Sequence, residues 1–136
     1  MTDDDAYWAS YPDTLTPADV AKILSVGRPA VHTRLKTGVI PGHLIGGSWI
    51  IFKAEIRSWL TSTSNQTPPG PPEPVDVLQG YPDEMSYRDL MTLTGKAERT
   101  IYAWLSNGEI PAFHAGNRWI IHKAQLKRKL SDTSNQ

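Results

Sequence analysis

The residues that could perform catalysis or hold a metal are sparse and scattered in this chain. No histidine has the spacing of a metal ligand or a set of carboxylate partners; the four are His32, His43, His114 and His122. There is no cysteine, so thiolate metal sites and disulfides are excluded. No phosphate-binding loop, nucleophile elbow or zinc signature is present. We therefore expect no enzyme, no catalytic residue, no bound metal and no cofactor.

The chemistry that remains is that of basic side chains. The net charge of the whole chain is zero, which alone argues against a nucleic-acid partner. The charge is unevenly distributed, however. Residues 11–66 hold six Lys or Arg against three Asp or Glu, a charge of +3, and residues 81–136 hold eight against six, a charge of +2. The other acidic residues lie outside both segments, at Asp3, Asp4, Asp5, Glu73 and Asp76.

These two basic segments are copies of one unit. Residues 11–66 align with residues 81–136 at a shift of 70 positions without a gap, and 19 of the 56 aligned positions are identical. An internal repeat of this size must be interpreted before any other feature, because it decides the architecture. The sequence therefore predicts an acidic N-terminal tail at 1–10, a first domain at 11–66, a linker at 67–80 and a second domain at 81–136.

The linker is rich in proline, with five prolines in the ten residues 67–76. Such a segment favours extended polyproline II structure and acts as a semi-rigid spacer, which at about 3.1 Å per residue reaches roughly 31 Å. A PxxP ligand for a proline-binding domain is the alternative. The spacer is the interpretation that we prefer, because this motif is common by chance in such linkers.

Each unit begins with a helix that has a clear start signal. Thr16 and Ser86 are hydroxyl N-caps, each followed three residues later by an acid, and Pro17 suits the first helical position. A short break containing glycine precedes a second helix, which we expect over about 28–37 and about 98–107. Gly38 and Gly108 then stand where a left-handed C-cap is needed.

The second half of each unit predicts a hairpin and a third helix. A turn at Gly46-Gly47, or Gly116-Asn117 in the second copy, separates short extended runs that end in Trp-Ile-Ile. The third helix has apolar residues four positions apart. Helix, tight turn, helix, hairpin and helix make a winged helix-turn-helix. The predicted fold class is mainly α with small β-hairpins: two tandem winged helix-turn-helix domains joined by a Pro-rich linker.

The ordered motifs of both copies resemble one family, the excisionase-like, MerR-type winged helix-turn-helix domains. Residues 15–24 resemble the opening helix of that family. The passages 38–43 and 108–113 resemble its Gly-x-[Ile/Leu]-Pro connection, and residues 46–51 and 116–121 resemble its wing. No single motif is specific, but the ordered set occurs twice and covers almost all of both copies.

The resemblance implies binding of double-stranded DNA, with the second helix in the major groove and the wing alongside. Carried over by position, the DNA-binding residues would be Arg28, Pro29, His32, Thr33, Lys36, Ser48, Arg99, Tyr102, Asn117 and Arg118. Gly47, Glu98 and Ala103 would lie at neighbouring positions of the same surfaces. An arginine at Arg28 or Arg99 could bind guanine O6 and N7 bidentately, and Arg118 could enter a narrow minor groove.

The copies depart from the family in different ways. The second recognition helix begins with Glu98 before Arg99, and the first wing has Ser48 where the second has Arg118. MerR proteins dimerise through a long coiled coil, and no sustained heptad is present here. We therefore expect a monomer with two DNA-binding heads that prefers direct-repeat half-sites, with a recombinase or another protein as a further partner.

Two functions follow from this resemblance, and a third remains open. The protein would be an excisionase-type recombination factor or a small transcriptional regulator. The alternative is a protein-interaction adaptor in which one or both winged helices bind a protein. No apolar run is long enough for a membrane span, and no secretory segment precedes the first unit. The expected location is the cytoplasm of a bacterial or phage-type system, in association with the nucleoid.

Several aromatic and basic residues have a structural interpretation beside a functional one. We expect the tryptophans of the two units to pack in the cores instead of stacking on bases; these are Trp49, Trp59, Trp104 and Trp119. The run Lys127-Arg128-Lys129 is equally compatible with a phosphate contact and with a solvated helix end. The roles of Tyr7 and Trp8 stay open.

Overall fold

The computed structural model describes residues 3–66 and 70–136. The predicted linker residues Thr67, Pro68 and Pro69, and Met1 and Thr2 of the predicted tail, lie outside the described residues. The chain forms two compact units, and along the linker the division falls between Val77 and Leu78. Each unit is described by itself below.

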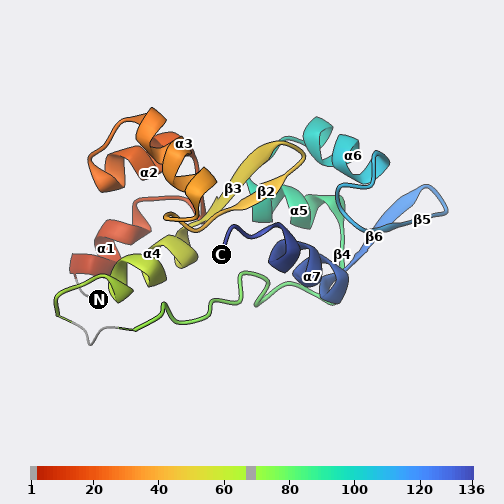
Figure 1. Ribbon diagram of the computed structural model, residues 1–136. Coiled ribbons are helices and arrows are strands. Elements are labelled where there is room, and N and C mark those ends of the chain that lie inside the picture. Colours follow the sequence, from red (N-terminus) through yellow and green to blue (C-terminus); the bar gives the residue numbers. More distant parts are fainter. Residues whose placement is uncertain (1–2, 67–69) are drawn as a thin grey trace. The chain divides into compact units, whose positions relative to one another are not determined.

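The first unit combines four helices with a three-stranded antiparallel sheet of order β1-β3-β2 (Figure 1). Its elements are α1 (Asp3–Ala9), β1 (Thr14–Leu15), α2 (Pro17–Leu24), α3 (Arg28–Thr37), β2 (His43–Ile45), β3 (Ser48–Phe52) and α4 (Lys53–Ser62). Helices α2 and α3 form the helix-turn-helix, and β2 and β3 form the wing. The structure of this unit thus agrees with the predicted fold class and with the family that the sequence resembles.

The second unit repeats this arrangement with a sheet of order β4-β6-β5. Its elements are β4 (Glu84–Met85), α5 (Tyr87–Thr94), α6 (Glu98–Ser106), β5 (Phe113–Ala115), β6 (Arg118–His122) and α7 (Lys123–Thr133). Each predicted hairpin is therefore part of a three-stranded sheet. The added strands β1 and β4 have two residues each, too few to produce a period-two pattern that sequence could show.

The predicted helix starts are confirmed in atomic detail. The Thr16 hydroxyl accepts from the Asp19 backbone N–H at 3.1 Å, while the Asp19 carboxylate accepts from the Thr16 N–H at 3.0 Å. Ser86 and Asp89 make the same reciprocal pair at 3.3 and 3.0 Å. Each capping box satisfies two backbone donors that a helix N-terminus leaves free.

The ends of the recognition helices differ slightly from expectation. Helix α3 ends at Thr37, and its C-cap Gly38 has a φ of 81°. Helix α6 ends at Ser106, one residue before the predicted end. Asn107 leaves the helix because its side-chain oxygen accepts from the Glu109 N–H at 3.0 Å, a local bond that competes with helical pairing. Gly108 then takes the left-handed conformation, with a φ of 82°.

The predicted core faces are buried in both units. The first core gathers residues from all its helices and the sheet; its buried members are Trp8, Leu15, Val20, Ala21, Val31, Leu35, Ile40, Ile51 and Ile56. Trp49 and Trp59 pack against it while partly exposed. The corresponding positions of the second unit are buried as well: Leu78, Met85, Leu90, Ile101, Leu105, Ile110, Ile121 and Leu126. Trp104 is also buried, and Trp119 is partly exposed.

The residues expected to form an acidic tail contain a helix. In α1 the Trp8 side chain enters the first core, with 6% of its surface exposed, and Asp5 pairs with Arg57 of α4. This placement gives Trp8 a structural role that the sequence left open. The Trp8 carbonyl accepts from the Tyr11 N–H, and the Leu78 carbonyl accepts from the Tyr81 N–H, both at 3.1 Å. The structural repeat therefore begins before the residues at which the sequence repeat becomes visible.

Candidate nucleic-acid interface

Helix α3 presents one continuous exposed face in the first unit. Val31 and Leu35 anchor its opposite side in the core. The helical period then brings the residues predicted to bind DNA to the solvent side, where all are exposed: Arg28, Pro29, His32, Thr33 and Lys36. Gly27 and Pro29 fix the helix start, since Pro at the first positions needs no backbone donor.

The polar side chains on this face differ in whether they already form hydrogen bonds within the protein. The Thr33 hydroxyl donates to the Pro29 carbonyl at 3.0 Å, so only its lone pairs are available to a ligand. Within the described part of the chain, the side chains of Arg28, His32 and Lys36 make no hydrogen bond or ion pair. These three side chains are therefore ready to bind an external acceptor or anion.

Helix α6 presents a different surface in the second unit. Ile101, Trp104 and Leu105 are buried, so Glu98, Arg99 and Ala103 are exposed and Tyr102 is partly exposed. Glu98 stands at the helix N-terminus, where the helix dipole favours an acid. The same carboxylate repels phosphate, so this helix start is less suited to a DNA backbone than the Arg28 start of α3.

An aromatic and cationic cluster, which we call the Tyr87 cluster, borders α6 and was not predicted. The Tyr87 and Tyr102 rings lie 5.1 Å apart between centroids, and Arg88 lies 5.7 Å from the Tyr87 centroid. The Arg88 Nε donates to the Tyr87 hydroxyl at 3.2 Å, and this bond raises the pKa of Arg88. Desolvation and then the neighbouring Tyr87 raise the pKa of Tyr102 above its ordinary value.

A comparison of the two copies in the sequence could have pointed to this cluster. Tyr87 and Arg88 occupy the first two positions of α5, where α2 has Pro17 and Ala18. In the second copy, two large side chains thus stand at a helix N-terminus where the first copy has a rigid and a small one. Only the structure places this pair beside Tyr102.

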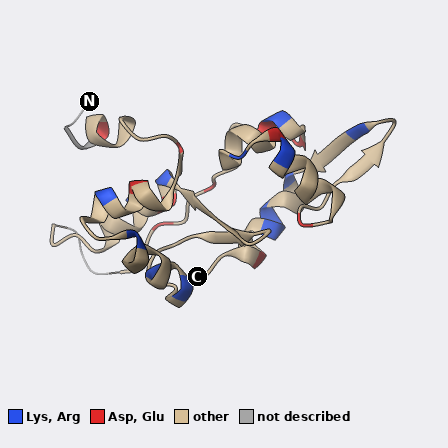
Figure 2. Ribbon diagram, turned by 90° about the horizontal axis from the view of Figure 1, so that it is seen from above, with Lys and Arg blue, Asp and Glu red and all other residues tan. Residues whose placement is uncertain are grey.

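The two wings share their turn geometry but differ in charge. Gly46 and Gly47 have φ values of 56° and 80°, and Gly116 and Asn117 have 59° and 66°. Two successive left-handed residues are typical of a type I′ hairpin, which matches the twist of the strands. Figure 2 shows no basic or acidic position on the first wing and a basic one on the second. In the second wing Asn117 and Arg118 are exposed at the tip, whereas Ser48 begins β3 of the first wing and is partly exposed.

The second wing also has an ordered aromatic pair. The His114 and Trp119 rings stack with centroids 4.4 Å apart and an interplanar angle of 14°. These residues are directly opposite in the register of β5 and β6, as are Ala115 and Arg118. The pair stiffens the hairpin that carries Arg118, because facing side chains stabilise antiparallel strands.

Neither a metal site nor a membrane helix is present in the part of the chain that the structure describes. No group of three or more His, Cys, Asp or Glu residues there is arranged to hold a metal. His43 instead pairs with Glu55 at 2.8 Å and is buried. No helix among residues 3–66 and 70–136 has the length and apolar character needed to cross a bilayer.

The comparisons with known proteins give one match. A family model described as a helix-turn-helix domain, of the excisionase-like type, matches the chain twice, at residues 14–64 and 85–132. No curated protein and no solved structure matches the chain. The two matched segments cover most of the sequence, and each contains the helix-turn-helix and the wing of one repeat. The chain belongs to this family of DNA-binding helix-turn-helix domains and contains two of them in tandem.

Proposed function

We propose that the protein binds specific double-stranded DNA through both heads, as an excisionase-type recombination factor or a small transcriptional regulator. The family assignment makes it a DNA-binding, excisionase-like protein. The more specific role depends on where its sites lie, in attachment sites or in promoters. Recovering the genomic fragments bound by the protein distinguishes these two roles.

The exposed face of α3 is the observation that carries this proposal. It combines an arginine, a histidine, a lysine and a threonine on one side of a helix that a buried apolar side holds in place. An exposed arginine such as Arg28 can bind guanine bidentately, and an exposed lysine such as Lys36 suits a phosphate. The wing tip, at Asn117 and Arg118 in the second unit, adds donors for the backbone or minor groove.

We further propose that the heads recognise half-sites in direct repeat. Two domains joined head to tail on one chain are not related by the two-fold axis of a dimer, which would demand a palindrome. The estimate of a free spacer of about 31 Å does not hold while the linker is packed, because the Ser58 hydroxyl donates to the Glu73 carbonyl at 2.7 Å. The distance between the two half-sites therefore has to be measured by selecting bound sequences from a random pool.

Titration of the protein on pooled random duplexes at several salt concentrations tests DNA binding. Each phosphate contact contributes about −0.9 to the slope of log affinity against log salt, so two heads should give a slope of several units. A matched titration of the Arg28→Ala and Lys36→Ala variant should give a shallower slope. Absence of salt-sensitive binding at low ionic strength would reject the proposal.

An adaptor function is the second candidate, and the surface of α6 favours it. Glu98 opposes phosphate at the helix start, while Tyr87, Arg88 and Tyr102 form an aromatic and cationic surface of the kind that is enriched at protein interfaces. Under this alternative the first head binds DNA and the second binds a protein. DNA binding by residues 1–66 alone, unchanged when residues 78–136 are added, would favour it.

A further inference from the structure

The protein's own linker forms one wall of a hollow in the first unit. It lies between α4 and the connection that follows α3, and has a volume of about 290 Å³. Pro41, Glu55, Ser58 and Trp59 line it on the domain side, and the extended segment 72–75 lines it on the linker side. Gln136 lines it as well. We call the positions on the domain side the α4 groove.

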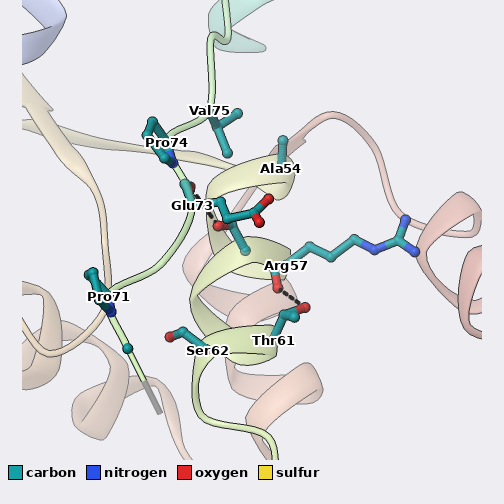
Figure 3. Close-up of a pocket in the computed structure, with 10 residues that line it drawn as sticks. Ala54, Arg57, Thr61, Ser62, Pro71, Glu73, Pro74 and Val75 are labelled. Atoms are coloured by element: carbon teal, nitrogen blue, oxygen red, sulfur yellow. Dashed lines mark hydrogen bonds between the residues drawn. The ribbon is translucent and has the colours of Figure 1, made fainter. Parts of the chain in front are cut away.

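The linker follows α4 beyond this hollow as well. A second cavity of about 530 Å³ lies between the helix and residues 70–75, with Ala54, Arg57 and Thr61 on the helix side. Figure 3 shows Pro71, Glu73, Pro74 and Val75 running alongside α4, and the Ser58–Glu73 hydrogen bond of 2.7 Å fixes the segment there. A proline-rich acidic segment thus uses the outer side of the third helix as its docking surface.

The second unit has a hollow at the corresponding place. Its volume is also about 290 Å³, and it is lined by Gly108, Pro111, Gln125, Arg128, Lys129 and Asp132. At the repeat shift of 70, Pro111 corresponds to Pro41, and Gln125, Arg128 and Lys129 correspond to Glu55, Ser58 and Trp59. The residues that line this hollow come only from the connection after α6 and from α7, and we call them the α7 groove.

The α7 groove differs from the α4 groove in charge. Glu55, Ser58 and Trp59 of the α4 groove sum to −1, whereas Gln125, Arg128, Lys129 and Asp132 of the α7 groove sum to +1. The segment that lies along the α4 groove is itself acidic, with Glu73 between two prolines and Asp76 two residues after Pro74. A groove at the corresponding place with more positive charge favours an acidic occupant still more.

We propose that the α7 groove is a docking site for an extended, acidic, proline-containing segment of a protein partner. Proline holds such a segment in the extended conformation before binding, so little entropy is lost on docking. Carboxylates of the segment pair with Arg128 and Lys129, and the prolines pack beside Pro111. None of the groove residues belongs to the recognition helix or the wing, so this site is independent of the proposed DNA contacts.

A peptide copy of the linker provides the probe. The capped peptide Gly-Pro-Pro-Glu-Pro-Val-Asp, with the sequence of residues 70–76, is titrated into the isotope-labelled full chain, and amide shifts are followed by NMR. We expect saturable shifts at Gly108, Gln125 and Arg128. The double variant Arg128→Ser and Lys129→Ser should bind about fivefold more weakly, since exposed ion pairs each contribute modestly. Lys127→Ser is the matched control, because Lys127 is exposed on α7 but does not line the groove, and it should bind as the wild type does.

Three outcomes would overturn the proposal. Shifts confined to α4 would mean that the peptide only competes with the linker for its own groove. An equal loss of peptide affinity in Lys127→Ser would mean a general attraction between opposite charges. A double variant that loses DNA affinity but keeps its peptide affinity would identify α7 as a phosphate-contacting helix. Because the peptide titration uses no DNA, its failure leaves the DNA-binding proposal untouched.

Discussion

The side chains of Lys53 and Lys123 bind backbone carbonyls of their own chain. Neither lysine is therefore available to bind DNA through these bonded hydrogens. Both begin the third helix of their unit. The Lys53 ammonium donates to the carbonyls of Trp8 and Tyr11 at 3.1 and 2.9 Å, and Lys123 donates to the Tyr81 carbonyl at 3.0 Å. These bonds hold the segment before the first strand against the third helix. These hydrogen bonds explain why both copies have a lysine at this position.

Replacement of these lysines should therefore reduce stability. We expect Lys53→Met to lower the free energy of unfolding by about 1–3 kcal/mol, because partly buried carbonyls lose their donor. Urea unfolding followed by circular dichroism measures this change. Lys36→Met, on the exposed face of α3, is the control and should change stability by no more than about 0.5 kcal/mol. Equal stability of the Lys53 and Lys36 variants would show that the carbonyls find other partners.

The arginines at the starts of the recognition helices should determine which DNA sequences the protein prefers. If Arg28 and Arg99 each bind a guanine, an alanine at either position should cost roughly 1–3 kcal/mol in binding and relax the preference at one base pair. Selection of bound sequences from a random pool, done for each variant, measures both effects. An Arg99→Ala variant with wild-type affinity and preference would assign DNA reading to the first head alone.

At the scale of elements, the wings of the two heads differ in charge. Both hairpins have the same turn, but only the second has an arginine at its tip, on a strand pair stiffened by the His114–Trp119 stack. A rigid hairpin presents its tip residue at a defined depth, which a minor-groove contact needs. The first wing offers Ser48, a weaker and uncharged group.

Replacing Arg118 should therefore have more effect than replacing Ser48. We expect Arg118→Ala to weaken DNA binding and to remove a preference for narrow, A·T-rich minor grooves. Fluorescence anisotropy on duplexes that differ only in A·T content beside the half-site tests this expectation. Ser48→Ala is the matched change in the other wing, and a larger effect there would reverse the assignment of the two wings.

At the scale of the whole molecule, tandem heads on one chain convert two weak contacts into one strong one. Once the first head is bound, the second experiences a high effective concentration set by the linker. The packing of residues 70–75 on α4 adds a constraint to this linker that a free proline-rich spacer would lack. A change that weakens the packing of the linker on α4 should therefore change the half-site spacings that the protein accepts.

The halves of the chain should bind far more weakly than the intact protein. We expect residues 1–66 and 78–136, tested separately on selected DNA, to lose much of the affinity, with the second half the stronger because it has Arg99 and Arg118. Gel-shift titrations of both halves and the full chain compare them directly. Binding by the first half alone would contradict this assignment of the anchor.

The selected site should be a direct repeat, and its spacing should depend on the linker. A Ser58→Ala variant removes the bond to the Glu73 carbonyl and should broaden the range of tolerated spacings. Selection with half-site spacing as the variable measures this range. Thr63→Ala serves as control, because its hydroxyl donates to the Leu60 carbonyl of α4 and Thr63 does not line the linker cavities. An inverted repeat bound by a dimer would rule out the tandem arrangement on DNA.

The sequence by itself determined the features that depend on neighbouring residues. The capping boxes at Thr16 and Ser86, the left-handed glycine after α3 and the hairpin turns all arise from contacts within a few residues, so their signals are local. Helical periodicity likewise separated the core face of α3 from the exposed face with the predicted DNA contacts. The repeat then extended each of these inferences to the second unit.

The tertiary structure alone decided the features that depend on residues far apart in the chain. Trp8 entered the first core, two-residue strands completed both sheets, and Tyr87 and Arg88 came to lie beside Tyr102. The proline-rich segment also packed on α4, although its composition indicated only an extended spacer. Such contacts leave no periodic or local pattern, because they depend on which surfaces remain uncovered once the helices have packed.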